Sequence, residues 1–171
     1  MLPRYPAHMS KTTVIILCVV GGILLLGLTC VGGVVGLGIW AGTQPPPEGI
    51  TLDMDLPDAV YAGDSFDLVL TIRNDKPNDR SLMDVDFWSP LLDGVTVSSV
   101  DPKPNRVDDN FWPTYIFNQT IPANGELVIT FSALADAPGV YAGELDISVD
   151  SIMSILSTQQ AITIYNAEDK P

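Results

Sequence analysis

Two of the residue types that carry much of enzyme chemistry are missing from most of the chain. The 171-residue sequence has one histidine, His8, and two cysteines, Cys18 and Cys30, so everything after residue 30 lacks both. That larger part therefore offers no Ser-His-Asp or Cys-His catalytic set and none of the usual zinc ligand sets. It also cannot form an internal disulfide and must fold on its own hydrophobic core. The sequence predicts a protein that is not an enzyme.

Acidic residues are absent from the start of the chain, and basic residues are scarce in the rest. No aspartate or glutamate precedes Glu48, and the part that follows the apolar segment has six basic residues against all 21 acidic ones. This part therefore carries a net charge of −15. Such a surface repels the phosphates of nucleic acid. We expect no nucleic-acid partner.

A single long apolar segment separates these two parts. Residues 14–40 carry no charge, and as a helix they would span about 40 Å, against about 30 Å for the hydrocarbon core of a bilayer. Secretory signals have apolar cores of about 7–15 residues, which is roughly half this length. We predict an uncleaved transmembrane helix over residues 13–41, with the lipid bilayer as its partner. Cleavage near Trp40 and lipidation at Cys30 are the alternatives.

The basic residues give the orientation of this helix. Arg4 and Lys11 precede it, and the next basic residue is Arg73. The positive-inside rule then places residues 1–12 in the cytoplasm and the C-terminal domain outside it, at the cell surface or in the periplasm.

Small residues form a stripe along the predicted helix, with a GxxxG pair at its centre. Such stripes let two helices approach closely in lipid, although glycine is also common in membrane helices for other reasons. We predict self-association, or docking on other membrane helices, through five residues: Gly22, Thr29, Gly32, Gly33 and Gly36.

After a proline-rich linker at 42–49, apolar and polar residues alternate, which is typical of strands with one buried face. Turn sequences such as Ala62-Gly63-Asp64 separate the strands, and no amphipathic helical stretch occurs. About seven to nine strands predict an all-β domain over 50–166, with two antiparallel sheets packed as a sandwich, and a C-terminal tail at 167–171. The segment 151–160 is ambiguous and is interpreted as an edge hairpin. The predicted strands are 50–56, 66–73, 83–87, 95–100, 114–121, 127–133, 145–149 and 161–165.

The start of this domain resembles a known family. Residues 57–74, PDAVYAGDSFDLVLTIRN, combine a Pro…Gly-Asp turn with a long strand that ends in Asn, and LLDGV follows at 91–95. This pattern resembles bacterial and archaeal cell-surface immunoglobulin-like modules of the CARDB and conserved-repeat adhesion type. The later segments 125–131 and 139–143 are similar to such modules and to cohesin-like sandwiches. The resemblance implies an immunoglobulin-like sandwich with a role in spacing, adhesion or protein binding, and it carries no catalytic residues.

Carboxylates offer the main remaining site chemistry. The stretch 101–110 is the longest predicted loop, and a loop can gather the oxygen ligands that calcium prefers. A solvated loop is the alternative, and we predict no other cofactor. The calcium candidates are Asp101, Asp108, Asp109 and Asn110.

Two tryptophans are candidates for a surface platform. Trp88 and Trp112 each follow a phenylalanine that alternation places inward, so we predict that both face solvent and offer a stacking surface for sugar or peptide. Packing in the core is the alternative.

Together these features predict a single-pass membrane-anchored, extracytoplasmic immunoglobulin-like module. We expect a non-enzymatic binding, adhesion or structural role, with an unknown extracytoplasmic protein or glycan as the partner. One alternative is an accessory subunit of a membrane or pilus-like assembly that docks through the glycine-rich helix. Another is a secreted protein produced by cleavage near residue 42.

Overall fold

Ten β-strands dominate the part of the chain that the computed structural model describes, which is residues 45–57, 59–88, 90–109 and 111–170. A short 3-10 turn, η1 (Ala167–Asp169), follows the last strand. The strands are β1 (Ile50–Asp55), β2 (Val60–Tyr61), β3 (Ser65–Asn74), β4 (Arg80–Phe87), β5 (Val95–Asp101), β6 (Arg106–Asp108), β7 (Thr114–Ile121), β8 (Gly125–Ala135), β9 (Gly139–Val149) and β10 (Ile155–Tyr165).

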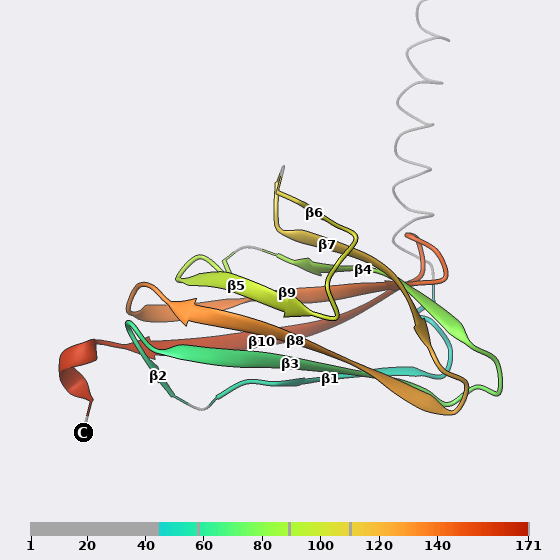
Figure 1. The fold of residues 1–171 in the computed structure, drawn as a ribbon, viewed down its shortest axis with the longest axis horizontal. Coiled ribbons are helices and arrows are strands. Elements are labelled where there is room, and N and C mark those ends of the chain that lie inside the picture. Colours follow the sequence, from blue (N-terminus) through green and yellow to red (C-terminus); the bar gives the residue numbers. More distant parts are fainter. Residues whose placement is uncertain (1–44, 58, 89, 110, 171) are drawn as a thin grey trace, which may run out of the picture. The chain divides into compact units, whose positions relative to one another are not determined.

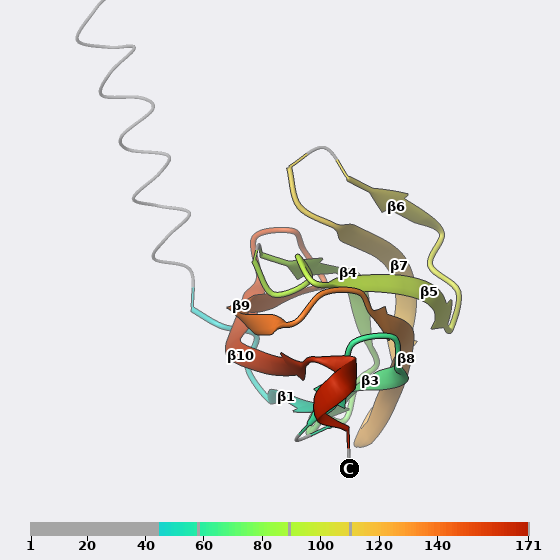
Figure 2. The same cartoon turned by 90° about the vertical axis from the view of Figure 1, so that its left-hand side faces the viewer.

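The strands form two sheets that pack against each other (Figures 1 and 2). One sheet has the order β1-β3-β8-β5 and the other has the order β2-β10-β9-β4-β7-β6. Neighbouring strands run antiparallel, except that β2 pairs with β10 in parallel. The predicted all-β sandwich is confirmed, with ten strands in the described residues where seven to nine were expected. The pattern missed β2 and β6 because two and three residues are too few to show alternation.

Alternation along the strands builds the core between the sheets. In β3, Leu68, Leu70 and Ile72 are almost completely buried. Across the interface, Phe131 of β8 meets Phe87 of β4 edge to face, with ring centroids 5.1 Å apart. Full burial of each such side chain stabilises a fold by roughly 1.5–3 kcal/mol, so this apolar layer holds the two sheets together.

One strand departs from the predicted alternation. The sequence places Met83 inward with Val85 and Phe87, but the register of β4 shifts between Leu82 and Asp84. Leu82 is fully buried, whereas Met83 is half-buried. A β-bulge inserts one extra residue and changes which side chains face the core, and the alternation pattern alone does not locate it.

Two segments that the sequence left irregular contain strands. The short β6 interrupts the predicted loop 101–110, so the prediction of one long loop there is wrong. Residues 151–153 form a turn and residues 155–160 are the first part of β10, which pairs along its length with β9, so the predicted separate edge hairpin at 151–160 is wrong. Both strands find partners through backbone hydrogen bonds, which require no strong apolar pattern.

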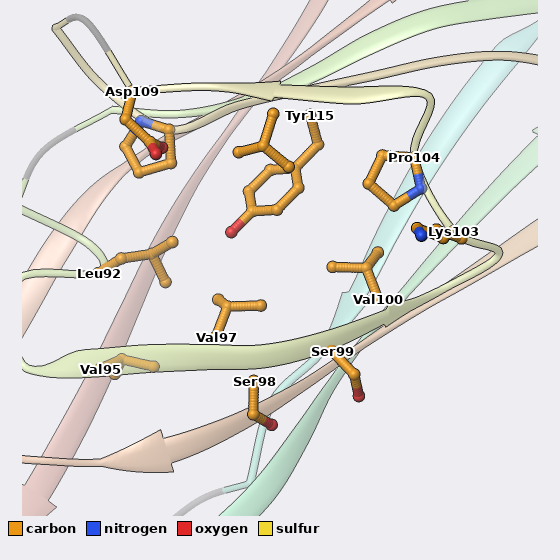
Figure 3. Close-up of a pocket in the computed structure, with 12 residues that line it drawn as sticks. Leu92, Val95, Val97, Ser98, Ser99, Val100, Lys103, Pro104, Asp109 and Tyr115 are labelled. Carbon is orange, nitrogen blue, oxygen red and sulfur yellow. The ribbon is translucent and has the colours of Figure 1, made fainter.

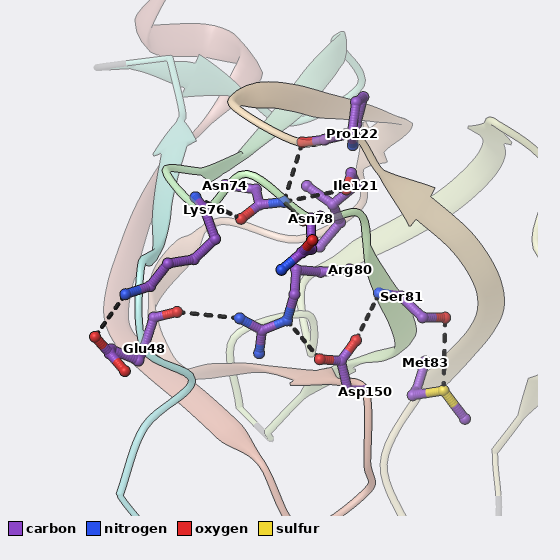
Figure 4. A network of polar contacts seen from close by, with 10 residues as sticks. All are labelled: Glu48, Asn74, Lys76, Asn78, Arg80, Ser81, Met83, Ile121, Pro122 and Asp150. Carbon is purple, nitrogen blue, oxygen red and sulfur yellow. Dashed lines mark hydrogen bonds and ion pairs between the residues drawn. The ribbon is translucent and has the colours of Figure 1, made fainter.

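A polar network ties the start of the domain to neighbouring turns (Figure 4). Arg80 donates to the backbone carbonyl of Glu48 at 3.1 Å and also forms an ion pair with Asp150. The Glu48 carboxylate pairs with Lys76, and Pro47 is buried. The last residues of the predicted linker therefore pack against the sandwich.

The predicted N-terminal features lie outside the described residues. This holds for the cytoplasmic tail, the transmembrane helix over 13–41 and the helix-association residues. Within the described part of the chain, no helix has the length and apolar character needed to cross a bilayer. At the other end, Lys170 pairs with Asp64 at 2.7 Å, so the predicted C-terminal tail contacts the turn before β3.

Candidate functional site

A groove of about 610 Å³ lies between β5 of one sheet and the β6–β7 hairpin of the other (Figure 3). β5 and β6 are each the last strand of their sheet, so each has one edge without a neighbouring strand. The volume falls within the range of roughly 300–1,000 Å³ that is typical of ligand pockets. The lining is mainly apolar and includes Leu92, Val95, Val97, Val100, Val107 and Tyr115.

Local irregularities in β5 and β6 shape this groove. The register of β5 shifts between Val97 and Ser99. Strict alternation from Val97 would turn Val100 to solvent, but the shift brings both valines to the groove (Figure 3). β6 has three residues and covers part of the eight-residue β7. The two sheets are therefore left partly uncovered along this side.

Tyr115 places a polar group in the apolar lining. The residue is 7% exposed, and its ring packs edge to face against Phe131, with centroids 5.1 Å apart, and against Phe87. Its hydroxyl points into the groove (Figure 3) and has no hydrogen-bond partner among the described residues. The hydroxyl oxygen is not among the buried polar atoms that lack a partner, so it reaches solvent through the open groove and can donate to a bound acceptor.

The Tyr115 hydroxyl stays protonated at any physiological pH. Burial, followed by the negative charge of Asp109, raises the pKa of Tyr115 to about 12. The groove therefore presents a neutral hydrogen-bond donor at its centre, not a phenolate nucleophile or base.

The predicted calcium residues are spread over the groove and its rim. Asp101 ends β5, Asp108 lies in β6 with Arg106 at 3.8 Å, and Asp109 lines the groove. Asn110 lies outside the described residues. Among the residues described, no group of three histidine, cysteine or acidic side chains is arranged to hold a metal ion. Because one candidate ligand is not described, calcium binding stays a prediction.

The two candidate platform tryptophans lie together. Trp88 and Trp112 stack on each other with centroids 4.1 Å apart. Trp88 is 38% exposed, as predicted, but Trp112 is half-buried. Phe111, which alternation placed inward, is 87% exposed, so that part of the prediction is wrong. Each tryptophan therefore uses one ring face against the other and leaves less surface for a ligand than two separate rings would. Use of the pair as a platform stays a prediction.

A cluster of carboxylates escaped the sequence analysis. Asp84 and Asp86 of β4 and Asp146 of β9 each have one buried carboxylate oxygen without a hydrogen-bond partner. Burial raises the pKa values of Asp84 and Asp86, and the neighbouring carboxylates raise them further, although hydrogen bonds from Ser148 and Thr114 oppose the change. Alternation predicts a solvated acidic face here, but Asp146 is 8% exposed.

Comparison with known proteins gives a likeness of fold. No family model and no curated protein matches the chain. Among solved structures, a CARDB domain from Pyrococcus furiosus matches with 13% identity and a TM-score of 0.46, covering 68% of this chain and 94% of that one. The chain is similar in fold to a CARDB domain. The resemblance predicted from the sequence is confirmed at that level.

Two other solved structures show the same level of likeness. The cupredoxin domain of amoB from Nitrosocaldus yellowstonii has 14% identity and a TM-score of 0.46, covering 75% of this chain and 95% of that one. A cohesin module from a Clostridium perfringens family 33 glycoside hydrolase has 6% identity and a TM-score of 0.43, and the match covers 68% of this chain and 97% of that one. Identities this low concern the fold alone and do not indicate what this chain binds.

Proposed function

We propose that this protein is a non-enzymatic binding module that receives its ligand in the groove between β5 and the β6–β7 hairpin. The observation that carries the proposal is the hydroxyl of the buried residue Tyr115, which has no hydrogen-bond partner among the described residues and is directed into a mainly apolar groove. Ligand sites commonly combine an apolar lining with a few polar groups that orient the ligand. The absence of histidine and cysteine from the sequence after residue 30 favours binding over catalysis.

The sequence supports a location for this module. The uncharged segment 14–40 and the basic residues before it support a single membrane anchor with the domain outside the cytoplasm. The ligand would then be an extracytoplasmic molecule. A role as an accessory subunit that docks through the glycine-rich helix is compatible with the same groove.

Selection of binding peptides from a random library tests whether the groove is a binding site, without assuming which ligand it receives. The full-length chain in detergent would be compared with Val97→Trp, which fills the groove, and with Val128→Trp. Val128 is 42% exposed in β8 and does not line the groove. We expect peptides that bind the native chain and Val128→Trp but not Val97→Trp. Equal binding to both variants would overturn the proposal, provided that circular dichroism shows both to be folded.

A further inference from the structure

The groove carries opposite charges at its two ends. Lys103 lies at one end, past Val100, and Asp109 lies at the other end, on the side of Leu92 (Figure 3). β5 runs along the groove between them and has seven residues. At about 3.3 Å per residue, such a strand spans roughly 20 Å. The site is therefore elongated, with an apolar middle and a charge at each end.

Lys103 differs from the other basic residues of the domain. Among the described residues, Lys103 takes part in no ion pair. The groove therefore offers a free ammonium group in a part of the chain whose net charge is −15. The basic residues that do form ion pairs are Arg73, Lys76, Arg80, Arg106 and Lys170.

Asp109 is the matching group at the opposite end. It is exposed and forms no ion pair among the described residues. The negative charge of Asp109 contributes to the raised pKa of Tyr115, so the electrostatic field of this carboxylate reaches the groove. A cationic group of a ligand would be attracted to this end and repelled from the end at Lys103.

We infer that the groove binds an extended polypeptide segment with apolar side chains in its middle, a basic residue at the Asp109 end and an acidic residue at the Lys103 end. The inference rests on the proposed function. An extended chain points every second side chain to the same face, so two or three apolar side chains of one segment can enter the groove together. The Tyr115 hydroxyl then donates a hydrogen bond to a carbonyl oxygen of the segment.

Side chains, more than strand pairing, carry this recognition. The bulge in β5 and the short length of β6 both limit the formation of a continuous ladder with a further strand. Charge at the two ends supplies specificity and fixes the direction of the bound segment. A purely apolar ligand would make no use of either charge.

Three capped heptapeptides test the inference. They share the core Val-Ser-Val-Ser-Val and carry Lys and Glu, two Lys, or two Glu at their ends. We expect the peptide with one Lys and one Glu to bind the full-length chain at least about tenfold more tightly than either other peptide, measured by isothermal titration calorimetry. Simple attraction to a domain of charge −15 predicts instead that the peptide with two Lys binds most tightly, which would overturn the inference.

A charge reversal sharpens the test. Lys103→Glu makes both ends of the groove acidic, so we expect the preference to move to the peptide with two Lys. Arg73→Glu makes the same change in net charge away from the groove and should leave the original preference intact. Identical behaviour of the two variants would contradict the inference. Suppose that none of the three peptides binds, but that peptides selected from the library bind the native chain and not Val97→Trp. The charge pairing is then wrong and the proposed function stands.

Discussion

The indole N–H of Trp88 donates a hydrogen bond to the Asp146 carboxylate at 2.7 Å and so joins the end of β4 to β9. Trp88 also stacks on Trp112, which leads into β7. This contact explains why an aspartate on the outer face of a sheet is 8% exposed. The tryptophan covers the carboxylate and satisfies one of its oxygens.

Loss of this hydrogen bond should destabilise the domain. Trp88→Phe keeps an aromatic ring but removes the N–H, so we expect the free energy of unfolding to fall by about 1–3 kcal/mol. Trp112→Phe is the matched control, because no hydrogen bond from its indole occurs among the described residues. Urea unfolding of the full-length chain, followed by circular dichroism, measures both. Equal losses of the free energy of unfolding in the two variants would show that the stacking of the two rings, and not the hydrogen bond, stabilises this contact.

The carboxylate cluster should make stability depend on pH in an unusual direction. Burial raises the pKa values of Asp84 and Asp86 in the folded state, so that state binds protons more tightly than the unfolded chain. The free energy of unfolding should then rise as the pH falls from 7 through these raised values. The gain in the free energy of unfolding is complete below about pH 3.9, where the aspartates of the unfolded chain are also protonated.

Amide variants isolate this contribution from the other charges of the domain. Asp84→Asn and Asp86→Asn should each flatten the rise in stability between pH 7 and pH 4. Asp53→Asn changes an exposed residue of β1 and should leave the slope as it is in the native chain. If the free energy of unfolding of Asp84→Asn and Asp86→Asn still rose between pH 7 and pH 4 as it does in the native chain, these two aspartates would not be the cause of the rise.

Asn74 should be a strong determinant of stability. It is 1% exposed, and its side-chain amide donates to the carbonyl oxygens of Asn78 at 2.8 Å and Pro122 at 3.1 Å. Its side-chain oxygen accepts from the backbone N–H of Lys76 at 3.0 Å (Figure 4). Asn74→Ala should lower the free energy of unfolding by about 1–3 kcal/mol, because the buried carbonyl of Ile121, which accepts from the same amide at 3.4 Å, and the part-buried partners lose these hydrogen bonds. Asn78→Ala keeps the accepting backbone carbonyl and should cost less than about 1 kcal/mol in the same urea measurement.

Tyr115 should affect binding and not stability. Its hydroxyl has no partner among the described residues, so Tyr115→Phe should leave the thermal midpoint unchanged or raise it. The same variant should weaken binding of groove-dependent peptides by about threefold to tenfold. Tyr141→Phe is the control, because the Tyr141 hydroxyl donates to the carbonyl oxygen of Ala137 at 3.1 Å. Its loss should lower the free energy of unfolding by about 1 kcal/mol and leave peptide binding intact.

Strand positions could be predicted from the sequence where alternation is long. Leu68, Leu70 and Ile72 alternate with neighbours that are exposed or half-buried, and all three are buried as expected. Alternation failed at Leu82 because a bulge there depends on how β4 meets both of its neighbours. The order of the strands in each sheet depends on packing between distant segments, which local patterns do not contain.

The groove could not be predicted for the same reason. Val97 and Tyr115 both belong to strands with apolar alternation, and such residues are expected in a closed core. The opening between them depends on the register shift in β5 and on the short β6. Asp109 was singled out as a calcium candidate, and the sequence did not show that it lies at the rim of this groove.

Site-specific photo-cross-linking in the cells that make the protein can show whether a partner occupies the groove. Val107 lines the groove and is 43% exposed, and Val128 is 42% exposed outside the groove. With benzoylphenylalanine at each position in turn, we expect cross-links from position 107 to a discrete partner, and we expect them to be lost when Val97→Trp fills the groove. Cross-links of equal yield and pattern from both positions, or cross-links from 107 that survive Val97→Trp, would contradict the groove as the binding site.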